Sequence, residues 1–176
     1  MKTYSGQIYH LEENEVFVFG SNLDGFHGAG AAGYASFLEY GNVWRKYNYD
    51  KKPNGWKGAW NIKGVAEGYQ EGMLGTSYSL PTVAACGLKK SLSLQQISKY
   101  VETFYTFARN NPDKNFYYAQ TNKPGLNGHD PKDLAVLFSK NIPDNVIFEE
   151  SFAELILNYL EFEIEKDEWK CYDMPV

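Results

Sequence analysis

The fold is decided by residues 16–32, Val16-Phe17-Val18-Phe19-Gly20-Ser21-Asn22-Leu23-Asp24-Gly25-Phe26-His27-Gly28-Ala29-Gly30-Ala31-Ala32. The four apolar residues at 16–19 predict a strand that is covered on both faces, as in a parallel sheet between helices. A polar turn and then small residues follow, and glycine lets backbone N–H groups approach an anion where a Cβ would block the way. The stretch therefore predicts a strand that ends at a phosphate-binding loop.

Composition limits the classes of protein to which the chain can belong. Its 176 residues, of which 43% are hydrophobic, suit one domain spanning 1–176. Seventeen basic and 22 acidic side chains give a formal net charge of -5, so no overall positive field favours a nucleic-acid duplex or an anionic membrane. A free nucleotide stays compatible with this charge, because a few backbone amides can hold a pyrophosphate.

The cysteines and histidines carry no metal-binding pattern. Cys86 and Cys171 lie far apart without ligand spacing, and the three histidines are scattered, so we expect no disulfide framework, no metal and no cofactor. No apolar stretch has the length of a signal sequence or of a transmembrane span. We expect a cytoplasmic protein that is not attached to a membrane.

Strands and helices are predicted to alternate after the first strand, which is typical of a sheet with helices on both faces. The helices are marked by helical spacing of apolar residues and by predicted caps, which are capping boxes of Ser93 with Gln96 and of Ser151 with Glu154 and the Asp130-Pro131 pair. Runs rich in aromatic and β-branched residues mark the strands. The expected elements are a helix over 31–40, a strand over 78–82 with a bulge or an end at Pro81, a helix over 94–108, a strand over 115–120, a helix from 131, a strand over 145–149 and a helix over 151–162.

Two segments fall outside this alternation. Residues 42–75 contain three tryptophans and six glycines, which favours a loop, or a loop with one hairpin, that either packs on the domain or acts as a lid on a base. At the other end, 151–176 is expected to form the C-terminal helix and tail, in which acidic residues make a solvated helix end. Trp169 and Tyr172 could cover the core or a neighbouring subunit.

Residues 28–33 match G-x-G-x-x-G, the pattern of a dinucleotide-binding Rossmann unit. In that unit the first glycine follows the strand directly, whereas here eight residues separate Phe19 from Gly28. An acidic residue should also follow a second strand about 20 residues later, and no strand is predicted there. The spacing disfavours the Rossmann interpretation.

A second glycine-bearing loop, at 121–131, again follows a strand and precedes a helix. Its free amides and the positive end of the helix suit a phosphate. Ordinary turn geometry would explain either loop alone. Two such loops at the carboxyl ends of strands can hold one diphosphate, and this convergence is the central expectation.

Together these motifs resemble the small macrodomain-like proteins of bacteria and their phages. The resemblance covers 15–152 except 42–64 and rests on Phe19-Gly20-Ser21-Asn22 with Gly25, on 27–32, on Gly75-x-Ser77-Tyr78-x-Leu80-Pro81-Thr82, and on 125–128. It implies an α/β class fold, a three-layer α/β/α arrangement with a mixed, mostly parallel central sheet, that binds ADP-ribose or a derivative. An ADP-ribosylated protein would then be a further partner.

The resemblance also implies roles for residues. Asn22 would contact the distal ribose, two loops would surround the diphosphate, and His129 would stand where an aromatic side chain covers the phosphate. No residue near the start of the chain is assigned to the aspartate that holds adenine in the family. The implied ligand-binding residues are Gly20, Ser21, Asn22, Gly28, Ala29, Gly30, Ala31, Gly125, Leu126, Asn127, Gly128 and His129.

Catalytic residues can be proposed from chemistry. Asp24 and His27 lie in the same loop as Asn22, and a carboxylate with an imidazole can supply a general base and a general acid near neutral pH. We expect Asn22, Asp24 and His27 to support hydrolysis at the distal ribose, either as an ADP-ribose 1''-phosphate phosphatase or as an ADP-ribosyl hydrolase. Alternatively, His27 is an N–H donor that pins the loop.

Two other classes of protein stay open at this point. The first is a non-catalytic module that senses or sequesters an ADP-ribose-like nucleotide, which needs the same loops but no acid or base. The second is a structural or interaction protein in which the glycines are only turns.

Overall fold

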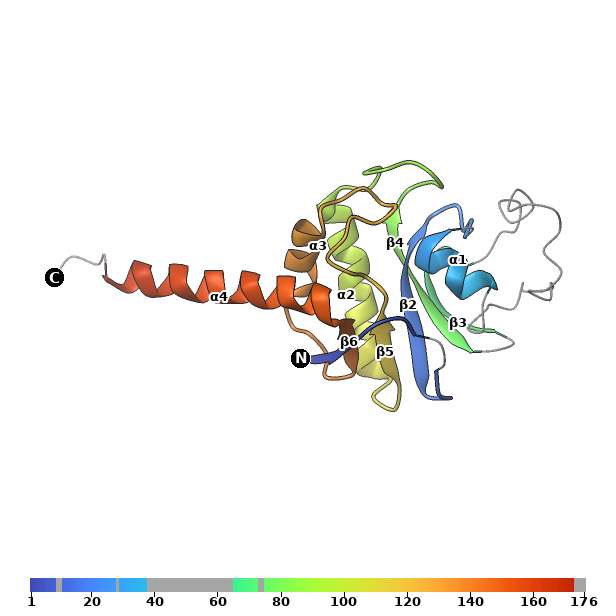
Figure 1. Cartoon of the computed structure of the whole chain (residues 1–176), viewed down its shortest axis with the longest axis horizontal. Coiled ribbons are helices and arrows are strands. Elements are labelled where there is room, and N and C mark those ends of the chain that lie inside the picture. The colour runs from blue at the N-terminus through green and yellow to red at the C-terminus, as the bar shows by residue number, and fades with distance from the viewer. Residues whose placement is uncertain (9–10, 28, 38–64, 73–74, 173–176) are drawn as a thin grey trace.

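The computed structural model describes residues 1–8, 11–27, 29–37, 65–72 and 75–172 (Figure 1). Along these residues the elements are β1 (Lys2–Tyr4), β2 (Glu15–Asn22), α1 (Gly30–Phe37), β3 (Gly68–Glu71), β4 (Thr76–Val83), α2 (Leu94–Asn110), β5 (Asn115–Tyr118), α3 (Pro131–Phe138), β6 (Val146–Glu149) and α4 (Glu150–Tyr172).

The described strands form one six-stranded sheet in the order β1-β6-β5-β2-β4-β3. All neighbouring pairs are parallel except β3 and β4, which are antiparallel. The predicted mixed, mostly parallel sheet is therefore confirmed. The carboxyl ends of β2, β4 and β5 meet at one edge, since these strands run side by side in the same direction.

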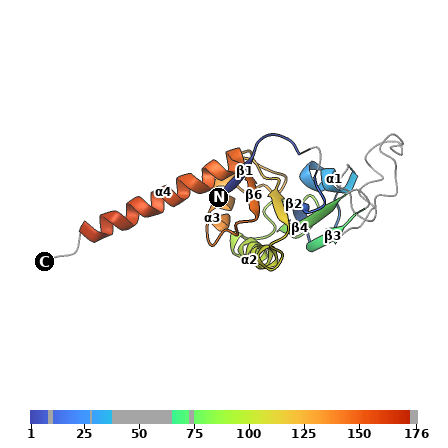
Figure 2. The same ribbon diagram turned by 90° about the horizontal axis from the view of Figure 1, so that it is seen from below.

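Alternate residues of β2 face two different layers. Val16 and Val18 belong to the large core cluster between the sheet and α2, α3 and α4, whereas Phe17 and Phe19 pack with Ala35 of α1. Figures 1 and 2 show α1 on one side of the sheet and α2 on the other. The run of apolar residues that decides the fold is thus buried on both faces, as predicted.

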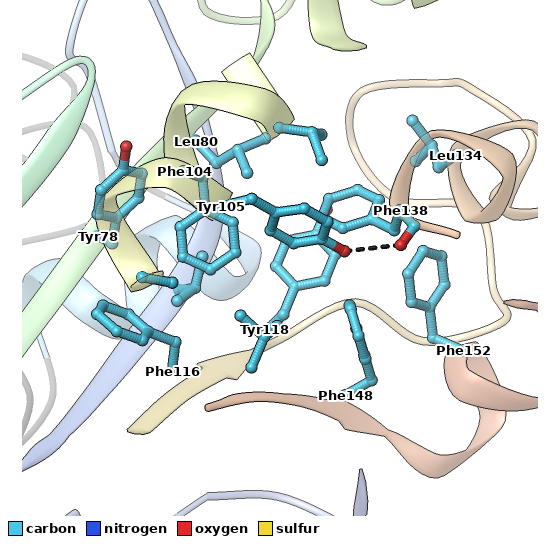
Figure 3. Packing of buried hydrophobic residues seen from close by; sticks show 14 of the residues in the cluster. Tyr78, Leu80, Phe104, Tyr105, Phe116, Tyr118, Leu134, Phe138, Phe148 and Phe152 are labelled. Carbon is cyan, nitrogen blue, oxygen red and sulfur yellow. Dashed lines mark hydrogen bonds between the residues drawn. The ribbon is translucent and has the colours of Figure 1, made fainter. Parts of the chain in front are cut away.

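Aromatic rings fill the larger core. The rings of Tyr118 and Phe138 are stacked with centroids 4.5 Å apart, and Phe148 and Phe152 meet them edge-on. The buried hydroxyl of Tyr105 donates to the carbonyl oxygen of Phe138 at 2.7 Å (Figure 3). This bond joins α2 to the last turn of α3.

The predicted caps are confirmed in α2 and α3 and are wrong in α4. Ser93 and Gln96 form the capping box of α2, and the side chain of Asp130 caps α3 ahead of Pro131. In α4 the predicted box of Ser151 with Glu154 does not form. The helix begins one residue earlier, and the carboxylate of Glu149 accepts from the backbone N–H groups of Ser151 and Phe152.

Several strand and helix boundaries differ from the predicted ones, including the start of β4 at Thr76 and the end of β5 at Tyr118. The polar residues Gly20, Ser21 and Asn22 belong to β2, because they pair with the last residues of β4. The three residues of β1 were not predicted, and they pair with β6. Helix α1 begins at Gly30, and its predicted end lies outside the described residues. Helix α4 continues to Tyr172 instead of ending near 162.

The segment predicted as a loop or a hairpin contains β3, which forms a hairpin with β4. Its tryptophans, Trp44, Trp56 and Trp60, lie outside the described residues. In β4 the pairing with β2 shifts after Pro81, so that Ser21 faces Pro81 and Asn22 faces Val83. Of the two alternatives expected at Pro81, a bulge or a strand end, the register shift favours the bulge, because β4 continues to Val83.

Only the first part of α4 packs on the body. Phe152 and Ile156 are buried in the core, whereas Leu157, Phe162 and Ile164 are exposed. Figures 1 and 2 show the rest of the helix extending away from the sheet. Within the described part of the chain, no helix combines the length and the apolar character needed to cross a membrane.

Candidate functional site

A cleft of about 450 Å³ lies at the carboxyl ends of β2, β4 and β5. The loops that follow these three strands all contribute to its walls, together with the first turn of α1. Its lining residues are Gly20, Ser21, Asn22, Phe26, Ala29, Gly30, Ala31, Ala32, Thr82, Val83, Cys86, Gly87, Lys89, Ala119, Gln120, Thr121, Lys123, Pro124, Gly125, Leu126 and Asn127. The two loops expected to converge therefore do share one cavity.

Most of the predicted site residues line this cleft, but not all of them. Those that line it are Gly20, Ser21, Asn22, Ala29, Gly30, Ala31, Gly125, Leu126 and Asn127. Asp24, His27, Gly128 and His129 are absent from the lining, and Gly28 lies outside the described residues.

The side chain of Asn22 closes the turn after β2. Its Nδ2 donates to the carbonyl oxygen of Phe26 at 2.6 Å, and its Oδ1 accepts from the N–H of Phe26 at 3.1 Å. Gly25 occupies the left-handed region within this turn, with φ of 74°, which favours glycine. Asn22 is thus held rigidly at the wall of the cleft.

The side chain of Leu126 in the second loop lies close to Gly30 at the start of α1. A Cβ placed on Gly30 would lie 3.3 Å from Cδ1 of Leu126, and the φ of Gly30 is 58°. The side chain of Leu126 is 66% exposed, so it forms part of the rim and not of the core. Glycine at position 30 keeps the passage between the loops open.

In the second loop, Asn127 and His129 hold the backbone in place. Oδ1 of Asn127 accepts from the N–H of His129 at 2.8 Å, and Nε2 of His129 donates to the carbonyl oxygen of Leu92 at 2.9 Å. His129 is buried below the loop, which gives it a supporting position instead of the phosphate-covering one implied by the resemblance.

His27 is almost fully buried, with 1% of its surface exposed. Its Nε2 donates to the carbonyl oxygen of Val65 at 2.8 Å, and its ring meets that of Phe19 edge-on. Burial lowers the pKa of His27 below its ordinary value of 6.5, although hydrogen bonds with the backbone of Val65 and Phe26 act in the opposite direction. This placement favours the pinning role over the acid–base role.

A hydrogen bond of Asp24 joins the loop after β2 to the loop after β4. Its Oδ2 accepts from the backbone N–H of Cys86 at 3.3 Å, and Cys86 itself lines the cleft. Burial, and secondly the charge of Asp24, raises the pKa of the Cys86 thiol. The carboxylate is therefore adjacent to the cleft wall but not part of it.

Two cations line the cleft, Lys89 and Lys123, and its described lining includes no carboxylate. Lys89 also packs against Gly128, where an added Cβ would lie 2.9 Å from Cβ of the lysine. Among the described residues no group of three or more histidine, cysteine, aspartate or glutamate side chains could hold a metal ion. The charge of the cleft suits an anionic ligand.

A second cavity, of about 380 Å³, adjoins the cleft. The two share Gly30, Ala31, Ala119 and Thr121. The remaining lining residues are Tyr4, Gly6, Gln7, Ile8, Phe17, Tyr34 and Glu149. Phe17 and Tyr34 supply aromatic rings with centroids 5.6 Å apart, and the hydroxyl of Tyr34 donates to the carbonyl oxygen of Ile8.

Apart from Gly30 and Ala31, the residues of this second cavity were missed as site residues by the sequence interpretation. They come from β1 and the segment after it, from β2 and α1, and from the ends of β5 and β6, so no single motif contains them. The loop after β4, with Cys86, Gly87 and Lys89, was missed too. Only the topology could have indicated this loop. The loop follows β4, which runs parallel to β2, and the loops after neighbouring parallel strands meet at the same edge of the sheet.

Comparison of the sequence with protein-family models and with curated proteins gives no match. Among solved structures, the chain is similar to a mutant form of a macrodomain from Oceanobacillus iheyensis, with a TM-score of 0.51 and 14% sequence identity. The match covers 92% of this chain and 90% of that chain. With its mostly parallel sheet between two helical layers, the chain has a macrodomain-like α/β fold.

Proposed function

We propose that this chain binds ADP-ribose or a close derivative in the two adjoining cavities. The observation that carries the proposal is that the two cavities share Gly30 and Ala31, so that a cavity with the aromatic rings of Phe17 and Tyr34 adjoins a cleft whose lining includes two lysines. A nucleoside diphosphate sugar has the same sequence of chemical parts, with a planar base, a diphosphate and a polar sugar. The macrodomain named in the structural comparison supports the same class of ligand.

The diphosphate is proposed to lie between the first turn of α1 and the loop after β5. The first turn of α1 contains no acidic side chain, so the positive end of the helix dipole favours an anion there. Lys89 and Lys123 add two positive charges on the walls. These groups compensate the two negative charges of a diphosphate.

The distal ribose is proposed to lie beyond the diphosphate, next to Asn22 and the loop after β4. Both polar atoms of the Asn22 side chain already bind the backbone of Phe26, so its contribution is to shape the wall. At Gly20 an added Cβ would lie 3.0 Å from Oγ1 of Thr82, so β2 and β4 are closely packed beneath this part of the cleft. The base is proposed to occupy the second cavity, against Phe17 and Tyr34.

Binding is tested by isothermal titration of the protein with ADP-ribose, together with thermal unfolding at increasing ligand concentration. We expect saturable heat and a rise in the midpoint of unfolding, because a ligand that binds only the folded state stabilises it. ADP and ribose 5-phosphate serve as partial ligands that each fill one end. Absence of heat and of stabilisation with millimolar ADP-ribose would contradict the proposal.

We further propose hydrolysis at the distal ribose, with Asp24 as the general base. Its Oδ2 binds the N–H of Cys86, a residue that lines the cleft, while no hydrogen bond to its Oδ1 is found among the described residues. On ADP-ribose 1''-phosphate, water would attack phosphorus and give its proton to Asp24. The bond from phosphorus to the ribose oxygen would break, and that oxygen would take a proton from solvent.

The hydrolytic proposal is tested by the release of inorganic phosphate from ADP-ribose 1''-phosphate and by the release of ADP-ribose from an ADP-ribosylated protein. We expect Asp24→Asn to abolish turnover and to leave the affinity for ADP-ribose within about threefold, because it removes a proton acceptor while keeping the size of the side chain. Tight binding without turnover of either substrate by the unchanged protein would instead identify a sensor.

A further inference from the structure

The exposed large apolar side chains of the described residues, Met1 apart, fall into two groups. Three lie in the loops after β2, β4 and β5, and three lie on α4. The members are Leu23, Leu88 and Leu126 in the loops and Leu157, Phe162 and Ile164 on the helix. A single exposed leucine is ordinary on a protein surface, whereas two such groups on one molecule indicate surfaces that make contacts.

Three lysines accompany the leucines of the loops. They are Lys89 and Lys90 in the loop after β4 and Lys123 in the loop after β5. All three are exposed, and none of them forms an ion pair with a described residue. The rim is the name used below for Leu23, Leu88, Leu126 and these three lysines. It combines apolar side chains with positive charge beside the cleft, whose lining includes Leu126, Lys89 and Lys123.

The acidic side chains of the same loops do not cancel this charge. The three loops contain two of them, Asp24 and Asp130, against three lysines. Asp24 accepts from the backbone N–H of Cys86, and Asp130 accepts from that of Lys132 in the first turn of α3. The rim is therefore suited to a partner that is apolar and negatively charged.

Backbone hydrogen bonds join the three loops into one surface. The N–H of Leu23 donates to the carbonyl oxygen of Val83 at 3.3 Å, and the N–H of Lys90 donates to the carbonyl oxygen of Asn127 at 2.8 Å. Lys90 also has a positive φ of 53°, a conformation that costs a lysine more than a glycine. The side chains of the rim thus stand on a backbone that neighbouring loops hold in place.

The far half of α4, residues 157–172, has the complementary character. One face of this half carries two apolar and two acidic side chains, which are Leu157, Glu161, Ile164 and Glu165. Their spacings of four and seven residues place them on the same side of the helix, and all four are exposed. Figures 1 and 2 show this half extending away from the body, so it does not cover the rim of its own chain.

We propose that the far half of α4 docks on the rim of a second copy of this chain. Leu157 and Ile164 pack against the leucines of the rim, as an amphipathic helix does in an apolar groove. Glu161 and Glu165 face its lysines. In a two-fold dimer each helix lies on the rim of the other chain, so both groups of both chains are covered. The inference does not depend on the proposed function, because it concerns only the association of two copies.

The test measures the mass of the full chain in solution by size exclusion with light scattering, at concentrations up to about 100 µM. We expect twice the 20.1 kDa of one copy. The dissociation constant should rise about fivefold or more between low ionic strength and about 0.5 M salt, since salt screens the pairs of glutamate and lysine. A monomer at the highest concentration would overturn the inference and leave both surfaces to other partners.

Charge reversal makes the test specific. We expect Glu161→Lys/Glu165→Lys on α4, and separately Lys89→Glu/Lys90→Glu on the rim, to weaken the dimer at least about tenfold, because like charges then face each other. An equimolar mixture of the two variants should regain the dimer, since each helix then meets a rim of opposite charge. A mixture that stays monomeric would overturn the inference, and so would a dimer that either variant retains alone.

Glu102→Lys/Asp113→Lys is the matched control. It makes the same change in net charge as the α4 variant, at two exposed residues on α2 and in the turn before β5. We expect its dissociation constant to stay within about twofold of that of the unchanged protein. Loss of the dimer in this control would assign the effect to net charge instead of to the contact between α4 and the rim, and that result would overturn the inference.

Discussion

Gly30 at the start of α1 and Leu126 in the loop after β5 face each other across the cleft, with 3.3 Å between the position of an added Cβ and Cδ1 of the leucine. We expect Gly30→Ala to weaken ADP-ribose binding at least about tenfold, because the methyl group enters the passage proposed for the diphosphate. The positive φ of 58° adds a cost of about 1 kcal/mol in the free energy of unfolding.

Gly68→Ala controls for the backbone effect. Gly68 also has a positive φ, of 98°, but an added Cβ would meet nothing within 4 Å, and the residue lines neither cavity. Titration calorimetry of both variants measures the effect of the methyl group on ligand affinity. Chemical denaturation of both variants measures the cost of the positive φ in the free energy of unfolding. Similar affinities of the two variants would show that position 30 does not border the ligand.

The two lysines of the cleft should contribute to affinity through charge. We expect Lys89→Ala and Lys123→Ala each to weaken ADP-ribose binding by about three- to tenfold at low ionic strength, and by less in 0.5 M salt. Lys132→Ala, on the exposed side of α3, serves as the control. An unchanged affinity in the double lysine variant would place the phosphates elsewhere.

Stability should fall in mildly acidic solution because of His27. Burial lowers the pKa of this residue in the folded protein, so between that value and 6.5 the unfolded chain binds a proton that the folded one does not. The stability that the folded protein gains by burying a neutral His27 is fully present above pH 6.5. It is lost as the pH falls toward the pKa of His27 in the folded protein. Denaturant unfolding at pH 7.5, 6.5 and 5.5 measures it.

His27→Gln should flatten this pH dependence, since glutamine does not titrate and its amide can still donate to the carbonyl oxygen of Val65. We expect turnover, where it is detected, to persist in this variant. A complete loss of turnover with unchanged affinity would restore the acid–base role predicted for the histidine from the sequence.

The hydrogen bond between Tyr105 and Phe138 should stabilise the core without affecting the ligand site. We expect Tyr105→Phe to lower the free energy of unfolding by about 1–2 kcal/mol, because the carbonyl oxygen of Phe138 loses its buried donor. Tyr100→Phe is the control on the same helix, since no hydrogen bond of its hydroxyl is found among the described residues. A loss of ADP-ribose affinity in Tyr105→Phe would contradict the separation of core and site.

Much of the fold could be predicted because its signals are local. The apolar run from Val16 to Phe19 is buried on both faces, and the caps at Ser93 and Asp130 involve neighbouring residues only. The meeting of the two loops could also be predicted, since it follows from parallel strands whose carboxyl ends share one edge.

The missed features depend on partners far away in the sequence. β1 has only three residues and becomes a strand by pairing with Ile147 and its neighbours, and β2 extends to Asn22 because β4 supplies partners there. The same holds for the site, where His27 is withdrawn from the cleft by a hydrogen bond to Val65. No local pattern could reveal such a contact.

The protruding helix α4 changes the meaning of the acidic composition. Of the 22 acidic and 17 basic side chains of the chain, α4 contains seven and two, which leaves 15 of each outside it. Its far half extends away from the sheet in Figure 1, and ions screen exposed charges beyond about 8 Å at physiological salt. A nucleotide that diffuses toward the cleft is therefore screened from the charges on this far half, so the net charge of -5 overstates the repulsion that an anion meets there.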